Sequence, residues 1–119
     1  EIACGRHVCI ARVGVAVVSW GAGHFGQLGQ GPHVSHLKEP QIIRQLLPQS
    51  TGSPVVQLAA GAWHLCARTE NGKVFAWGSN RRYQCGMKAP STLVYPQPID
   101  GNIAFTKIVC GKSHCIGLE

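Results

Sequence analysis

Short apolar runs separated by turn residues recur along the chain, and the pattern is clearest in its middle. Residues 55–60 (VVQLAA), 65–69 and 74–77 are apolar runs, divided by Gly61 and by Asn71-Gly72. Asn-Gly between two apolar runs is a strong hairpin signal, because both central residues of a type I′ turn need positive φ. We therefore expect three short antiparallel strands in succession here.

A fourth, weaker strand is predicted near residues 98–99, with a counterpart near 41–43, and each follows a proline-containing segment. Residues 42–47 (IIRQLL) have a helical spacing of apolar positions, but the stretch is short and lies between Pro40 and Pro48. We assign residues 30–54 to a variable connection between units. Four short strands per unit without a convincing helical period are typical of a propeller blade, so the pattern predicts an all-β fold.

One segment of the chain returns with its key residues in register, which makes the pattern a sequence repeat. Residues 20–29 (WGAGHFGQLG) return at 77–86 as WGSNRRYQCG. His7 and His64 keep the same offset upstream, and His114 opens another copy in CGKSHCIGL. We expect two repeats, at 5–61 and 62–111, with a third beginning at 110–119. Since one repeat cannot bury its apolar face alone, we also expect the chain to be part of a longer array.

These motifs resemble the regulator of chromosome condensation (RCC1) family, whose repeats carry a WG…GQLG signature and a preceding small-Gly-x-x-His motif. The resemblance covers nearly the whole chain. Residues 77–86 depart from it at Tyr83 and Cys85, and Gly5-Arg6-His7 is one residue short. The resemblance implies a seven-bladed β-propeller of antiparallel four-stranded blades in the intact protein, with residues 1–119 forming about two blades.

The repeated positions have structural explanations. Glycine serves turns that need positive φ or a close backbone approach. The Trp residues end apolar strands, where they can pack between blades while the indole N–H finds a carbonyl, and a His ring nitrogen can tie a turn to the backbone. One such residue per repeat argues for a scaffold and against a unique active site. The positions assigned this role are His7, Trp20, Gly21, Gly29, Gly61, His64, Trp77, Gly78, Gly86, Gly111 and His114.

Net charge and composition indicate which classes of binding partner to expect. Lys and Arg number 11 against 5 Asp and Glu, giving a formal net charge of +6, but only Arg81 and Arg82 adjoin. A diffuse positive charge favours acidic partners, nucleic acid included. The longest apolar run, 13–20, is too short to cross a bilayer, so no membrane partner is expected. Without a signal peptide, the six Cys are predicted to be reduced thiols of an intracellular protein, in the cytoplasm or the nucleus.

Two glycine-containing motifs resemble nucleotide sites. Residues 21–26 (GAGHFG) spell G-x-G-x-x-G after a predicted strand, but Gly31 and Pro32 prevent the helix that must follow, and the second copy lacks two of the glycines. Gly111-Lys112-Ser113 ends like a phosphate-binding loop, but Thr106 stands where that loop needs its first glycine. We predict no nucleotide cofactor.

Metal and acid–base chemistry are also weakly supported. Thiolates and imidazoles suit zinc, and two half-sites can be drawn, but neither has a C-x2-C step. In the repeat between the two half-sites, Ala60 occupies the position that Cys110 occupies in the next repeat. We therefore interpret the Cys positions as small apolar strand positions and predict no metal. The half-sites are Cys4, His7, Cys9 and Cys110, His114, Cys115. The acidic residues Glu1, Glu39, Glu70, Asp100 and Glu119 are isolated from one another, which predicts neither a catalytic dyad nor a small-molecule substrate.

We expect a protein-interaction platform that binds partners through loops. The divergent loop residues are the candidate interface, because aromatic and Arg side chains are typical anchors, although solvated turn residues are the alternative. These residues are His24, Phe25, Arg81, Arg82 and Tyr83. The resemblance implies a second function, guanine-nucleotide exchange on a Ran-type small GTPase with chromatin contact. Similarity to the plant UV-B photoreceptor is a weaker alternative, since Ala62 follows Gly61 where that protein has Trp.

Overall fold

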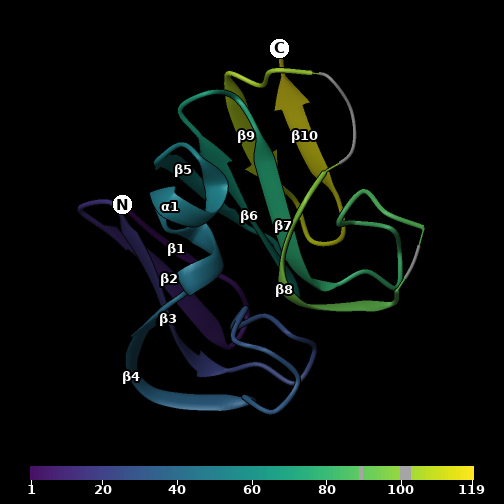
Figure 1. Ribbon diagram of the computed structural model, residues 1–119. Coiled ribbons are helices and arrows are strands. Elements are labelled where there is room, and N and C mark those ends of the chain that lie inside the picture. The colour runs from purple at the N-terminus through teal and green to yellow at the C-terminus, as the bar shows by residue number, and fades with distance from the viewer. Residues whose placement is uncertain (89, 100–102) are drawn as a thin grey trace.

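Antiparallel sheets make up nearly all of the regular secondary structure in the computed structural model, which describes residues 1–88, 90–99 and 103–119. The first sheet holds β1 (Ile2–Cys4), β2 (Val8–Val13), β3 (Ala16–Ala22) and β4 (His36–Ile42) in that order. The second holds β5 (Val55–Ala60), β6 (His64–Thr69), β7 (Val74–Ser79) and β8 (Thr92–Pro98). A hairpin of β9 (Lys107–Cys110) and β10 (Cys115–Leu118) follows (Figure 1). The predicted all-β class and the four-stranded antiparallel blades are confirmed.

The innermost strands β1, β5 and β9 lie side by side, so the three sheets follow one another around one side of the molecule (Figure 1). Backbone hydrogen bonds join the turns after these strands, from Arg6 N–H to the Ala62 carbonyl at 3.1 Å and from Ala62 N–H to the Lys112 carbonyl at 3.3 Å. Each blade therefore meets the next in the same way. No helix among the described residues is long and apolar enough to cross a membrane.

The blades are offset from the sequence repeats. Each innermost strand pairs with the strand after the glycine turn, so the blades run over 2–42 and 55–98, whereas the predicted units at 5–61 and 62–111 begin after that strand. The segment 30–54, predicted as a variable connection with a weak strand near 41–43, contains regular structure. It contains β4, the 3-10 helix η1 (Arg44–Leu46) and α1 (Pro48–Thr51), with Ile43 and Leu46 fully buried in the core. The helical spacing of residues 42–47 comes from these two apolar anchors.

His7 is not the structural equivalent of His64. The backbone N–H groups of Gly5, Gly61 and Gly111 donate to the carbonyls of Val8, His64 and His114, each at 2.8 Å. Strand register agrees, since Val8 pairs with Gly21 as His64 pairs with Gly78. The expected equivalence is therefore corrected by one residue, and His7 lies exposed in the turn. The sequence indicates this shift, because one residue separates Gly5 from His7, whereas two residues separate Gly61 from His64.

The predicted hairpin at Asn71-Gly72 is present, but with another turn. Gly72 has φ of 90°, while Tyr83 is the one non-glycine residue of positive φ in the described chain, so Asn71 does not adopt a type I′ conformation. The N–H of Thr69 donates to the Lys73 carbonyl at 2.8 Å and that of Gly72 to the Thr69 carbonyl at 2.9 Å. This is the three-residue loop in which a left-handed glycine closes a type I turn.

Trp77 joins the two complete blades. Its ring is fully buried, and its indole N–H donates to the Gln27 carbonyl of the preceding blade at 2.7 Å. Gly29 lies against the same ring, where a Cβ would be 3.1 Å from the indole nitrogen, and its φ is +67°. The predicted packing of this Trp between blades, with a carbonyl for its N–H, is confirmed. Trp20 occupies the matching strand position in the first blade and is half-buried.

Candidate functional site: a basic and aromatic loop face

Three turns of equal geometry present their side chains on one face of the molecule. Each turn connects an innermost strand to the next strand and begins with Gly5, Gly61 or Gly111. Because the turns are aligned by the hydrogen bonds between them, the same two turn positions recur in each blade. The first position holds Arg6, Ala62 and Lys112, and the second holds His7, Trp63 and Ser113.

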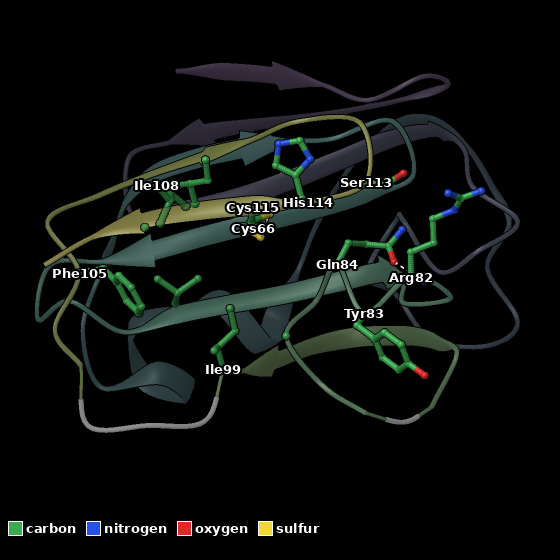
Figure 2. A pocket seen from close by; sticks show the side chains of 14 residues that line it. Cys66, Arg82, Tyr83, Gln84, Ile99, Phe105, Ile108, Ser113, His114 and Cys115 are labelled. Atoms are coloured by element: carbon green, nitrogen blue, oxygen red, sulfur yellow. Dashed lines mark hydrogen bonds between the residues drawn. The ribbon is translucent and has the colours of Figure 1, made fainter.

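Two longer loops, after β3 and β7, supply the rest of this face. In the first loop the side-chain oxygen of Gln27 accepts the N–H of Phe25 at 2.6 Å. In the second, Gln84 accepts the N–H of Arg82 in the same way at 2.8 Å (Figure 2). Both Gln side chains are buried, so the repeated Gln fixes the path of each loop while the residues before it vary. A conserved geometry with variable side chains is typical of a binding loop.

An aromatic ring from a glycine turn and one from the loop after β3 meet at the centre of the face. Phe25 packs edge-on against Trp63, with ring centroids 5.5 Å apart at 85°. The Arg81 guanidinium lies 4.8 Å from the Phe25 ring centre, and that of Arg6 lies 5.6 Å from the Trp63 ring centre. His7 adjoins Trp63 at 5.9 Å. We define the basic-aromatic face as Arg6, His7, Phe25, Trp63, Arg81, Arg82 and Lys112.

A hollow of about 510 Å³ opens on this face. Among the residues that the structure describes, its lining includes the two rings and three cations and no acidic side chain: Phe25, Trp63, Ser79, Arg81, Arg82, Gln84, Lys112 and Ser113. Arg side chains stacked on aromatic rings keep their N–H donors free for a carboxylate or phosphate. The hollow can therefore bind an anionic group together with an apolar or aromatic one.

The structure unites only part of the candidate interface expected from the sequence. Phe25, Arg81 and Arg82 come together at the hollow. His24 instead packs edge-on against His36 of β4, at 5.1 Å between ring centroids. Tyr83 is 67% exposed and lines an adjoining cavity of about 260 Å³, which shares Arg82, Gln84 and Ser113 with the hollow. Figure 2 shows Tyr83 in this cavity near Gln84.

Sequence reasoning missed Trp63, Arg6 and Lys112 as members of the face. The signal that could have found them is the turn triplet after each glycine, once the triplets are aligned on glycine instead of on histidine. That alignment places Arg6 and Lys112 at one turn position and Trp63 beside them. Their approach to Phe25 and Arg81 depends on how one blade meets the next, which the alignment does not contain.

Comparison with known families matches residues 16–68 and 71–118 to the Regulator of chromosome condensation (RCC1) repeat, and a second model of that repeat matches residues 55–84. The chain belongs to the RCC1 repeat family. The crystal structure of human WBSCR16 shares its fold, with a TM-score of 0.86 and 27% identity over 99% of this chain and 30% of that one. The fold expected from the resemblance, a β-propeller built of these blades, is thereby supported by the sequence and by the structure.

Among curated relatives, the human E3 ubiquitin-protein ligase HERC2 is 34% identical over 98% of this chain. The ultraviolet-B receptor UVR8 of Arabidopsis thaliana is 31% identical over the whole of it. The chain spans only 2% of the length of HERC2 and 27% of UVR8. The likeness therefore concerns the repeats and not the remainder of either protein.

Proposed function

We propose that these RCC1 repeats act as a protein-interaction platform, and that the basic-aromatic face binds an acidic segment of a protein partner. The observation that carries the proposal is the meeting of Phe25, Trp63 and Arg81 at one hollow. The guanidinium of Arg6 lies over the Trp63 ring beside it, so four separate segments of the chain contribute. Each ring is half-buried and each guanidinium is exposed, so the rings are held in place while the cations meet solvent.

The chemistry of this face suits an acidic and aromatic peptide. Aromatic and Arg side chains dominate binding energy at protein interfaces. Positive charge attracts an acidic partner from a distance and speeds its association. With Lys112 and Arg82 completing a lining without acidic side chains, the partner's carboxylates meet no like charge in the hollow.

The test compares charge reversal on and off this face in the intact protein. Arg81→Glu/Arg82→Glu should weaken binding of a fluorescently labelled Glu- and Tyr-rich peptide about tenfold or more, because attraction becomes repulsion at the hollow. Lys38→Glu/Arg44→Glu changes the net charge equally at exposed positions that do not line the hollow, and it should keep most of the affinity. Equal losses in the two variants would show that only net charge matters and would refute the proposal.

Guanine-nucleotide exchange on a Ran-type small GTPase, with chromatin contact, stays the second prediction from the family resemblance. The cationic hollow favours testing it, since an acidic GTPase surface and DNA both offer negative charge to such a face. Release of fluorescent nucleotide from a loaded Ran-type GTPase should accelerate when the intact protein is added. An unchanged rate would exclude exchange, and DNA binding without a steep dependence on salt would exclude direct chromatin contact.

A photoreceptor-like function stays the weaker alternative, and the positions of the Trp residues bear on it. Trp77 is fully buried, whereas Trp63 is half-buried in the basic-aromatic face. A change of oligomeric state on UV-B illumination, lost in Trp63→Phe, would support this function over the binding role proposed for the same side chain.

A further inference from the structure

Four side chains with metal-binding atoms meet where the second blade contacts the β9–β10 hairpin. His64 and Cys66 lie on β6, Cys110 ends β9 and Cys115 begins β10. The Cys115 sulfur lies 3.0 Å from His64 Nε2, 3.3 Å from the Cys66 sulfur and 2.6 Å from the Cys110 sulfur. Figure 2 shows the sulfur atoms of Cys66 and Cys115 together at the inner end of the cavity beside β10. None of these atoms belongs to the basic-aromatic face.

The preceding blade junction provides an internal comparison. Strand register shows which residues correspond. In the first blade Val8 and Ile10 of β2 pair with Gly21 and Ser19. In the second blade His64 and Cys66 pair with the corresponding residues Gly78 and Ala76, so Val8 is the equivalent of His64 and Ile10 that of Cys66. In the same way Ala60 and Leu65 pair with each other as Cys110 and Cys115 do.

All four residues of the earlier junction are apolar, and Val8, Ile10 and Leu65 are at most 2% exposed. The fold therefore needs no polar or sulfur atom at these positions. At the next junction the same four positions hold three thiols and one imidazole, which are all ligands that zinc accepts. His recurs at His114 and the Cys pair recurs at Cys4 and Cys9, so Cys66, which stands where Ile10 packs, is the residue that completes a four-donor set here.

The His64 ring supports this assignment independently. The residue is fully buried, its Nε2 points to Cys115, and its Nδ1 has no hydrogen-bond partner among the described residues. Gly61 leaves the space that the ring occupies, because a Cβ there would lie 2.1 Å from His64 Cε1. Nε2 therefore faces the thiols as a ligand atom, and coordination through it would hold the buried ring in place.

We propose that His64, Cys66, Cys110 and Cys115 form a zinc site that joins the second blade to the third. One imidazole and three thiolates are an established tetrahedral set for structural zinc. With zinc–sulfur bonds of about 2.3 Å, the sulfur atoms must stand about 3.8 Å apart. They therefore move outward from their present spacing, which rotation of the Cys110 and Cys115 side chains beside their short turn permits. Each coordinating thiol releases its proton to solvent, and no redox change occurs.

Metal can reach the site from two sides. Cys66 and Cys115 line the cavity of about 260 Å³ beside β10, and Cys110 lines a separate hollow of about 480 Å³ by the turns. The cluster differs from the half-sites drawn from the sequence. It unites Cys110 and Cys115 with two residues of β6, whereas His114 is exposed, and Cys4 and Cys9 contact each other in the first blade.

The experiment uses the intact protein, stripped of metal with a chelator under reducing conditions. We expect Co²⁺ to give the d–d bands of a tetrahedral site and thiolate-to-metal charge-transfer absorption, and Zn²⁺ to displace it at one equivalent per chain. Both readouts come from the unaltered sequence, so they do not depend on a variant that folds. Bound Zn²⁺ should also protect the partly exposed Cys110 and Cys115 from alkylation, as measured by mass spectrometry.

Variants then locate the site. His64→Val/Cys66→Ile/Cys110→Ala/Cys115→Leu copies the earlier junction, so it should fold and lose the charge-transfer band. Cys4→Ala/Cys9→Leu applies the same substitutions to the other Cys pair and should keep the band. The proposal fails if the unaltered protein gives no tetrahedral thiolate spectrum, or if the band survives in the first variant. The proposal also fails if Cys110 and Cys115 form a disulfide that survives treatment with the reductant.

Discussion

Replacing Trp77 by Phe tests whether the indole hydrogen bond holds adjacent blades together. Phe lacks the N–H that reaches the Gln27 carbonyl at 2.7 Å, and Gln27 is only 3% exposed, so the carbonyl is left without its partner and away from bulk water. An unpaired buried acceptor costs about 1–3 kcal/mol. The smaller ring leaves a space of about 40 Å³ between the blades, which adds about 1 kcal/mol. We expect Trp77→Phe to lower the free energy of unfolding by about 2–4 kcal/mol.

The assay is urea unfolding of the intact protein followed by circular dichroism, because removing a Trp alters the fluorescence signal. Trp63→Phe is the matched control, since it makes the same substitution at a half-buried ring of the face whose indole N–H makes no hydrogen bond within the described chain. We expect it to cost less than about 1 kcal/mol. Hydrogen exchange should also speed up locally in residues 26–29 of Trp77→Phe. If the two variants lose equal stability, the blade-joining role of Trp77 is wrong.

Two further substitutions probe the loops and the buried thiols. Tyr83 has φ of 59° where the aligned Gly26 has 78°, so Tyr83→Gly should raise the free energy of unfolding by up to about 1 kcal/mol, as measured by urea denaturation. Tyr83→Ala keeps a Cβ in the same conformation, and an equal gain there would refute strain as the cause. Burial raises the pKa of Cys85 from 9.0 to about 12, so its stabilising contribution is complete below pH 9 and is lost as the pH rises toward 12. Cys85→Ala should therefore flatten the decline of stability over that range, and unchanged pH profiles would contradict the prediction.

The scaffold was predictable because its signals are local and repeated. The return of Trp20 at Trp77 fixed the strand ends, and the glycines between them fixed the turns, so the blades and the position of Trp77 followed. His7 was placed wrongly because a one-residue difference in a turn reverses which side chain faces the core, and motif spacing cannot detect it. Strand register, which makes Val8 the equivalent of His64, was needed to correct this.

The candidate sites were less predictable because they form between blades. Phe25 and Trp63 come from loops of different blades, and their contact depends on the angle at which the two sheets meet. Cys110 and Cys115 were recognised as potential ligands, but their neighbours on β6 are fixed only by the way the hairpin packs on the second blade. A single sequence contains the residue types for both sites and not the distances between them.

The most direct test of the binding role is to follow the indole N–H signal of Trp63 by NMR while the Glu- and Tyr-rich peptide is added to the intact protein. Trp63→Phe assigns the signal by removing it, and the Trp77 indole serves as the internal reference, because it is buried and bonded to Gln27. The account predicts that the Trp63 signal shifts and saturates with the peptide, while the Trp77 signal stays in place. A peptide that binds with no shift at Trp63 would contradict the assignment of the basic-aromatic face as the binding site.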